Sequence, residues 1–439
     1  MSLILERLDS LPLKLLHGVA ALLCAVAFGI DLIEMSISTA LSAVFSAPPH
    51  QLSTASLSWL LASVYIGAVI GAPVVGRVAD RRGLQRTLTA TLLLLGVLSL
   101  LAAARPDPLW FGTFRLLSGV ALGAFPPLMI AYLTAIAPAA HRGLVTFWVC
   151  GVAYLAPPLG IFLVRWLTPV EPFGIEGWRW PFIVSGVAAL IVGAAFGYLP
   201  ESARSLLKMG QSEAAERVCS AYERSPPLAL PAWLGSADRV AGVDREPAPG
   251  NTRLLFVFTF ALYTLTPWAL IAFPLLTGPI LLERGHSLSN TLMYVAIATL
   301  GPIAATLLTG VFVDRIERRA ALVLSYALML AAAGAFFYSD YPPLLAGSVI
   351  AFSIGVAVSM PVMTLYGAEL FPTATRASAT TLAWAGNRLA AVLVPLAMLP
   401  LFRARGAALV GVEVAAALIA VIALVVFFGP KGAAGGVVQ

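Results

Sequence analysis

The sequence predicts an all-α membrane protein with twelve transmembrane helices in two pseudo-symmetric six-helix bundles. Composition is the first reason, since 60% of the 439 residues are hydrophobic and 11% are charged, against roughly 45–50% and about 25% in soluble domains. The second reason is that the apolar residues gather in twelve segments long enough to span a bilayer. The third reason is a charged motif that occurs once in each half of the chain.

Each apolar segment is expected to be a helix, because lipid offers no hydrogen-bond partners to an irregular backbone. The expected spans are residues 16–44, 54–78, 85–104, 108–136, 143–166, 179–199, 253–282, 289–312, 320–338, 342–368, 377–402 and 406–429. The polar segment after the sixth span is rich in Pro, Glu and Arg. It divides the chain into an N-terminal bundle (1–199), a cytoplasmic linker (200–252) and a C-terminal bundle (253–439).

The basic residues predict the orientation of these spans. The loop between the second and third spans alone carries Arg77, Arg81, Arg82 and Arg86, and the linker is also rich in Lys and Arg. Basic loops concentrate on the cytoplasmic side of membrane proteins. We therefore expect these loops and both termini in the cytoplasm, and the protein in a bacterial inner membrane. The net charge of +6 reflects this bias and does not indicate a nucleic-acid partner.

The loop after the second span has the pattern G-x-x-x-D-R-R-G-x-x-R over residues 76–86, and a weaker copy begins at Gly310. The pattern resembles the signature loop between helices 2 and 3 of the major facilitator superfamily. Residues 199–207 resemble the P-E-S-x-R-x-L segment of its sugar porters and organic-ion transporters, with Ala203 where proline is usual. Residues 368–377 resemble their A-E-L-F-P-T-x-x-R-A segment. The resemblance covers the whole chain and points to the branch that holds sugar porters, aromatic-acid and metabolite proton symporters and niacin-like transporters.

The resemblance implies a cytoplasmic latch, meaning acid–base pairs that stabilise the state closed on that side. Its expected members are Asp80, Arg81, Glu201, Arg204, Asp314, Glu369 and Arg376. The alternative is that these loop charges only set the topology.

Two carboxylates in the first span are the candidates for proton coupling. Asp31 and Glu34 lie three residues apart and therefore project from one face of a helix. Arg115 in the fourth span lies at a similar depth, roughly 10 Å from the outer end, so an acid–base pair can form. Burial and the repulsion between two neighbouring carboxylates both disfavour the state in which each of them is charged. This property suits reversible proton binding. The alternative is a structural ion pair that never titrates.

These residues also carry family resemblances. Arg115, Gly119 and Gly123 resemble the helix 4 motif of the superfamily, which links Arg115 to coupling. Residues 31–34 resemble the D-G-x-D pattern of aromatic-acid proton symporters, but Leu32 replaces the glycine and Glu34 the second aspartate.

An arginine in the middle of the eleventh span is the candidate for substrate binding. Burying a guanidinium without a partner costs several kcal/mol, so Arg388 is expected to face a cavity near mid-membrane and to bind an anion. Pairing with Glu413 in the last span is the alternative. Further expected contacts are Asn387, Tyr263, Trp268, Tyr294 and Tyr366, although aromatic residues in membrane helices mostly serve packing.

The sequence therefore predicts a proton-coupled secondary transporter that takes up a small organic ion by symport and acts as a monomer, with an organic carboxylate as the expected substrate class. The alternative is an exporter of drugs or metabolites working by proton antiport. No Walker loop, metal-ligand cluster or nucleophile triad is present in the sequence, so we expect no cofactor, no metal and no enzyme. A membrane-embedded enzyme and a non-transporting receptor are the remaining classes, and only a carrier would show uptake in proteoliposomes.

Overall fold

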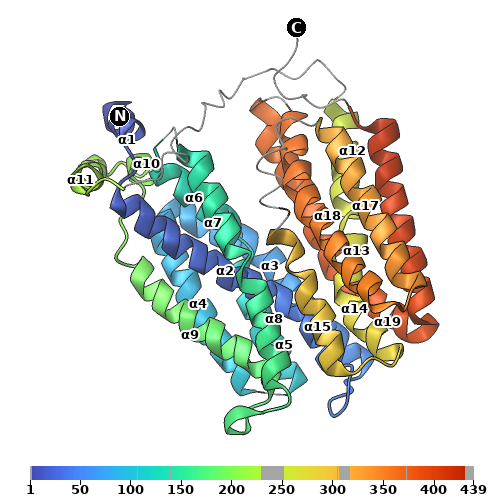
Figure 1. Cartoon of the computed structure of the whole chain (residues 1–439). Coiled ribbons are helices and arrows are strands. Elements are labelled where there is room, and N and C mark those ends of the chain that lie inside the picture. Colours follow the sequence, from blue (N-terminus) through green and yellow to red (C-terminus); the bar gives the residue numbers. More distant parts are fainter. Residues whose placement is uncertain are drawn as a thin grey trace. The chain divides into compact units, whose positions relative to one another are not determined.

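A computed structural model describes residues 2–105, 107–138, 141–228, 252–303, 305, 317–371 and 373–430. They form helices joined by short loops (Figure 1). Ten helical stretches among the described residues are long and apolar enough to cross a membrane. The first half contains α1 (Ser2–Ser10), α2 (Leu15–Val44), α3 (Thr54–Arg82), α4 (Leu84–Ala104), α5 (Pro108–Leu122), α6 (Phe125–Ile136), α7 (Arg142–Ala153), α8 (Ala156–Leu167), α9 (Trp180–Phe196), α10 (Ala203–Lys208) and α11 (Ser212–Arg224). The second half contains α12 (Thr252–Leu265), α13 (Pro267–Leu270), α14 (Ala272–Glu283), α15 (Leu288–Ala298), α17 (Arg318–Tyr338), α18 (Pro342–Glu369) and α19 (Thr373–Phe428).

Contacts within the chain define two compact units. Unit 1 comprises Met1–Met35, Ile66–Ala156 and Pro181–Val243, and unit 2 comprises Ser36–Tyr65, Pro157–Trp180 and Asp244–Gln439. The helices α2 and α3 each contribute to both units. Division of the chain at residues 199 and 252 stays a prediction.

In unit 1, α3 and α5 cross with their backbones in contact. A Cβ atom added to Gly67 would lie 1.9 Å from the carbonyl oxygen of Leu116, and one added to Gly71 would lie 2.0 Å from that of Val120. Gly123 meets the carbonyl of Ala68 in the same way, at 2.3 Å. Only glycine allows two helices to approach this closely.

Several expected spans are interrupted in the structure, and proline is the physical reason. Proline lacks an N–H group and its ring collides with the carbonyl four residues earlier. The span 108–136 breaks between α5 and α6 just before Pro126, and the span 143–166 breaks between α7 and α8 just before Pro157. The span 253–282 breaks twice, with Pro267 starting the four-residue helix α13. These interruptions are kinks within spans, because Pro108–Ile136, Trp148–Leu167 and Arg253–Glu283 are each still long and apolar enough to cross a membrane.

The start of α4 joins two of the sequence motifs. Gly83 precedes the helix with a φ of 97° and supplies no side-chain cap. Instead the Glu201 carboxylate accepts hydrogen bonds from the backbone N–H groups of Leu84 and Gln85, each at 3.1 Å. A Cβ atom at Gly83 would lie 2.2 Å from Oε2 of Glu201. The glycine is therefore required both by its backbone conformation and by the carboxylate that caps the helix.

Replacing Glu201 by alanine is expected to destabilise unit 1 by about 1 kcal/mol, the usual cost of losing a helix cap. Thermal unfolding of the purified protein measures the change. Glu6→Ala is the matched control, because Glu6 is an exposed glutamate in α1. Equal melting temperatures for the two variants would contradict the capping role.

The expected linker begins as helices docked on the N-terminus. Arg7 of α1 donates hydrogen bonds to Glu216 at 2.6 Å and to Glu223 at 2.9 Å, and these bonds raise the pKa of Arg7 above its ordinary value. Asp9 accepts from Arg204 at 2.6 Å and also pairs with Arg142. The helices α1, α10 and α11 were not expected from the sequence. All three are too short or too polar to register as spans.

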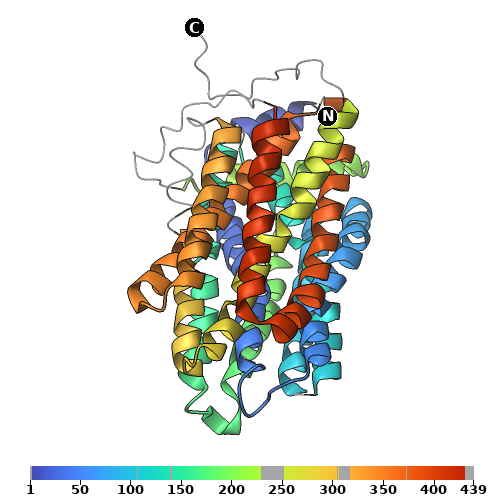
Figure 2. The same cartoon turned by 90° about the vertical axis from the view of Figure 1, so that its right-hand side faces the viewer.

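In unit 2, α12, α17, α18 and α19 pack side by side (Figures 1 and 2). The eleventh and twelfth expected spans are the two parts of α19, which turns at Gly406 with a φ of 76°. Phe273 of α14 stacks on Phe352 of α18 with ring centroids 4.0 Å apart. The end of α2 is held against α14, because the Ser42 hydroxyl donates to the carbonyl of Leu275 at 2.5 Å.

Candidate functional site

The most deeply buried charged residues of unit 1 form one ion pair. Arg115 of α5 donates from one terminal nitrogen to Oε2 of Glu34 at 2.8 Å, and from the other to the Glu34 backbone carbonyl at 2.9 Å. Both side chains are 1% exposed. The pairing expected between the first and fourth spans is therefore present.

Two serines complete the hydrogen bonding of the Glu34 carboxylate. Ser99 of α4 and Ser185 of α9 both donate to Oε1, each at 2.7 Å. The Arg115 guanidinium also lies over the ring of Phe182, 5.4 Å from its centroid. Four helices thus converge on one carboxylate. Neither serine was expected from the sequence, since an isolated serine in an apolar helix has no spacing that distinguishes it.

The Glu34 carboxylate and the Arg115 guanidinium depend on each other as buried partners. Separating a buried ion pair by removing one member typically costs about 3–5 kcal/mol, because the other charge stays buried. A proton on Glu34 would likewise weaken its attraction for Arg115. Asp31, one turn earlier on α2, is also buried, at 3% exposed. The structure places both candidate carboxylates in the interior of unit 1.

In unit 2, the broken region between α12 and α14 makes a second polar cluster. The carbonyl of Tyr263 would normally accept from the N–H group four residues later, but that residue is Pro267. The side chain of Asn387 replaces the missing donor, with Nδ2 at 2.9 Å from the Tyr263 carbonyl oxygen. Asn387 therefore compensates the break in the helix, a supporting role that its position in the sequence did not indicate.

Arg388 follows Asn387 on α19 and lies beside aromatic rings. Its guanidinium carbon is 6.0 Å from the ring centroid of Trp384, a distance typical of a cation–π contact. Trp384 in turn meets the ring of Tyr263 edge-on at 5.3 Å, while the Tyr263 hydroxyl donates to the carbonyl of Met363 at 3.1 Å. Arg388, Asn387, Tyr263 and Trp384 thus form one cluster. Trp384 was not among the residues expected from the sequence.

The other expected substrate residues have different surroundings. Tyr366 is buried near the end of α18, and its hydroxyl donates to the carbonyl of Pro430 at 2.5 Å. Tyr294 of α15 meets His286 edge-on with ring centroids 5.8 Å apart. Trp268 lies half-buried in α13, within the broken region. Glu413 is half-buried in the second part of α19.

The expected latch residues do not form one group among the described residues. Asp80 and Arg81 are exposed near the end of α3, Glu201 caps α4, and Arg204 binds Asp9. Asp314 and the side chains of Glu369 and Arg376 lie outside the described part of the chain. The described part of the chain contains no group of three or more His, Cys, Asp and Glu side chains that could hold a metal ion.

Known proteins resemble this chain along most of its length. The sequence model of the Major Facilitator Superfamily matches residues 21–395. The putative metabolite transport protein YyaJ of Bacillus subtilis is 24% identical over 97% of this chain and 95% of its own. The 4-hydroxybenzoate transporter PcaK of Acinetobacter baylyi is 27% identical over 86% and 82% of the two chains. The niacin transporter NiaP of the same organism is 23% identical over 73% and 72%.

Solved structures show the same fold. The xylose transporter XylE from E. coli superposes with a TM-score of 0.73 over 95% of this chain and 98% of its own, at 19% identity. At that identity the likeness concerns the fold. It confirms the fold class predicted from the sequence.

Proposed function

Because the chain belongs to the major facilitator superfamily and shares its fold, we propose that it is a proton-coupled symporter that carries a small organic carboxylate by alternating access. Members of this family are transporters and not enzymes, and the chain is an integral membrane protein. We further propose that its basic loops and both termini face the cytoplasm of a bacterium, as the distribution of arginines indicates.

Proton coupling is the first part of the proposal, and the buried Glu34–Arg115 pair carries it. A proton arriving at Glu34 neutralises the carboxylate and releases the Arg115 guanidinium from its charged partner. Arg115 binds helix α5 to helices α2, α4 and α9 through this one carboxylate. Protonation would therefore change how four helices are held together, which is the kind of step that couples a proton to a conformational change. Asp31, one turn away, serves as the second proton-binding group.

Binding of an anion at Arg388 is the second part. Arg388 lies beside the break in the α12–α14 region, and broken helices in transporters commonly mark the substrate site. The names of two relatives support a carboxylate as the substrate, because 4-hydroxybenzoate and niacin are both carboxylates at neutral pH. Other relatives are named for sugars. We assign Arg388 to the substrate, with the Trp384 ring beside it and Asn387 supporting the broken helix.

Replacing Arg388 by lysine is expected to weaken binding of the carboxylate substrate about tenfold or more, although the positive charge is kept. A planar guanidinium holds a carboxylate through two parallel hydrogen bonds, which an ammonium group cannot reproduce. Calorimetric titration of the purified protein with 4-hydroxybenzoate and niacin, the ligands named for two relatives, measures the change. Arg405→Lys, an exposed arginine on the same helix, is the matched control.

An unchanged affinity in Arg388→Lys would remove Arg388 from the substrate site. A preference of the parent protein for cations would instead support the alternative, an exporter working by proton antiport. In that case Asp31 and Glu34 would contact the cationic substrate. We also propose that the latch residues stabilise the state closed on the cytoplasmic side, with Asp80 as their central member.

A further inference from the structure

Unit 2 contains a cavity that includes none of the residues assigned above. It has a volume of about 660 Å³ and is lined by the chain just after α2, by the end of α14 and by the turn of α19. Cavities of this size commonly hold small organic molecules. The polar side chains that line it are Ser46, Glu283, His286 and Arg403.

The walls of this cavity are held in place by close contacts. The Ser42 hydroxyl bonds the Leu275 carbonyl at 2.5 Å, so the end of α2 is fixed to α14. A Cβ atom at Gly278 would lie 2.6 Å from the Cβ atom of Ala43, which shows how closely these helices approach. The third wall is shaped by Gly406, whose positive φ of 76° turns α19 back on itself. The site is therefore preformed in this structure.

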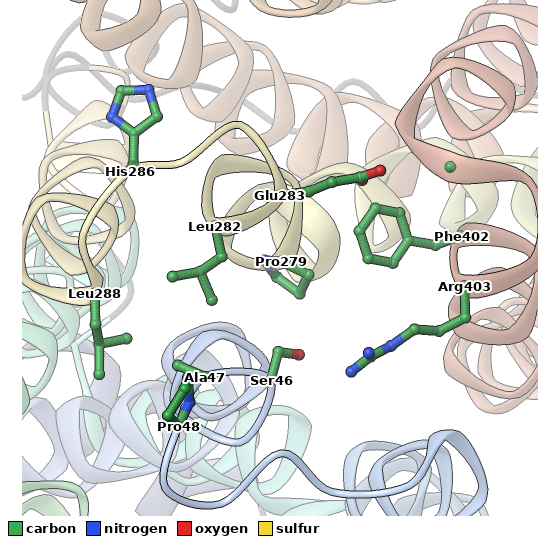
Figure 3. A pocket seen from close by; sticks show the side chains of 11 residues that line it. Ser46, Ala47, Pro48, Pro279, Leu282, Glu283, His286, Leu288, Phe402 and Arg403 are labelled. Carbon is green, nitrogen blue, oxygen red and sulfur yellow. The ribbon is translucent and has the colours of Figure 1, made fainter.

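The polar groups of the cavity are separated by an apolar surface (Figure 3). Figure 3 shows the carboxylate of Glu283 and the guanidinium of Arg403 on either side of the Phe402 ring. The Ser46 hydroxyl is on the Arg403 side, and its oxygen is buried with no hydrogen-bond partner among the described residues. The His286 ring points away from these groups and packs against Tyr294. The negative Glu283 and the positive Arg403 thus line one cavity whose surface between them is apolar.

We propose that this cavity binds a small molecule with a carboxylate at one end, a hydrogen-bond donor at the other and an apolar body between them. Arg403 would hold the carboxylate through a bidentate contact, and the Ser46 hydroxyl would donate to the same group. Glu283 would accept from an ammonium or hydroxyl group at the far end. Phe402 and Pro279, which both line the cavity, would pack against the apolar body.

This site is distinct from the proposed transport site. Arg403 follows Arg388 by fifteen residues on α19, which corresponds to roughly 22 Å along a straight helix. A ligand of one site cannot reach the other arginine. The two sites are therefore separable by mutation, and the second does not depend on the proposed substrate.

Calorimetric titration of the full-length protein in lipid nanodiscs with 4-(aminomethyl)benzoate tests the proposal. This probe carries a carboxylate and an ammonium group at opposite ends of a ring, while benzoate and benzylamine each lack one of the two. We expect saturable binding of the probe and weaker binding of both fragments. Arg403→Gln is expected to weaken binding of the probe about tenfold, the usual effect of losing a charged hydrogen bond. Glu283→Gln is expected to reduce the affinity of the probe to that of benzoate.

Two control variants separate this site from its surroundings. Arg405→Gln removes an exposed arginine two residues from Arg403 that does not line the cavity, and Arg388→Gln alters the proposed transport site. Arg405→Gln is expected to bind the probe like the parent. Because the probe is itself a benzoate, Arg388→Gln is expected to lose only the binding of benzoates at the proposed transport site and to keep the binding that depends on both Arg403 and Glu283. The proposal is overturned if the parent shows no saturable binding. It is also overturned if Arg388→Gln abolishes binding while Arg403→Gln leaves it unchanged.

Discussion

Replacing Glu34 by glutamine is expected to abolish accumulation of substrate driven by a pH gradient. Glutamine has nearly the same shape and its carbonyl oxygen still accepts hydrogen bonds from Ser99, Ser185 or Arg115, but it cannot bind and release a proton in the physiological range. Uptake by proteoliposomes with an imposed pH gradient measures the effect. Counterflow, in which labelled substrate exchanges without net proton movement, is expected to continue in this variant if Glu34 only carries the proton.

The matched control is Ser99→Ala, which removes one of the two hydroxyl donors to Oε1 and leaves the ion pair intact. We expect it to reduce uptake far less than Glu34→Gln. Undiminished accumulation by Glu34→Gln would exclude a coupling role for this residue.

A double substitution distinguishes a coupling pair from a structural one. Glu34→Gln alone leaves a buried guanidinium beside a neutral group, whereas Glu34→Leu with Arg115→Met removes both charges. Replacing a buried ion pair with apolar residues is often neutral or stabilising. The double variant is therefore expected to unfold at a temperature close to that of the parent and still to lack coupled uptake. Recovery of uptake in the double variant would show that the pair is only structural.

Replacing Gly67 by alanine is expected to prevent unit 1 from assembling correctly. The added methyl carbon would lie 1.9 Å from the Leu116 carbonyl oxygen, far inside van der Waals contact, and a backbone atom cannot move aside as a side chain can. The two helices would have to separate along their whole crossing, which continues at Gly71 and Gly123. Overpacking of this kind typically costs about 1–3 kcal/mol and occasionally more. We expect the upper end of that range, seen as loss of monodisperse protein in size-exclusion chromatography.

Gly76 offers a matched control on the same helix. A Cβ atom added there would meet no atom within 4 Å, so Gly76→Ala is expected to leave the protein intact or to stabilise α3 by up to about 1 kcal/mol. Equal yields of monodisperse protein from Gly67→Ala and Gly76→Ala would contradict the close crossing of α3 and α5.

The spans were predictable because a long apolar segment in a membrane has few alternatives to a helix. The prolines indicate where a span can be kinked, but they do not decide where the helix is interrupted. Pro361 lies inside the continuous helix α18, whereas Pro126, Pro157 and Pro267 accompany breaks. Whether a proline bends or breaks a helix depends on which neighbours supply the lost hydrogen bonds, as Asn387 does for the Tyr263 carbonyl. Those neighbours are distant in sequence.

The residues of the candidate sites likewise fall into those that the sequence indicates and those that only the packed structure shows. Sequence alone determined that Glu34 and Arg115 would need partners, because each charge in an apolar span is costly, and it placed them at matching depths. Only the tertiary structure brought Ser99 and Ser185 to the same carboxylate, and only it assigned Glu201 to the start of α4 and Asn387 to the break at Pro267. Ordinary polar residues acquire such roles from the atoms they meet. Charge and apolar length are properties of a segment and can be read along the chain, whereas a hydrogen-bond partner is a property of the packed molecule.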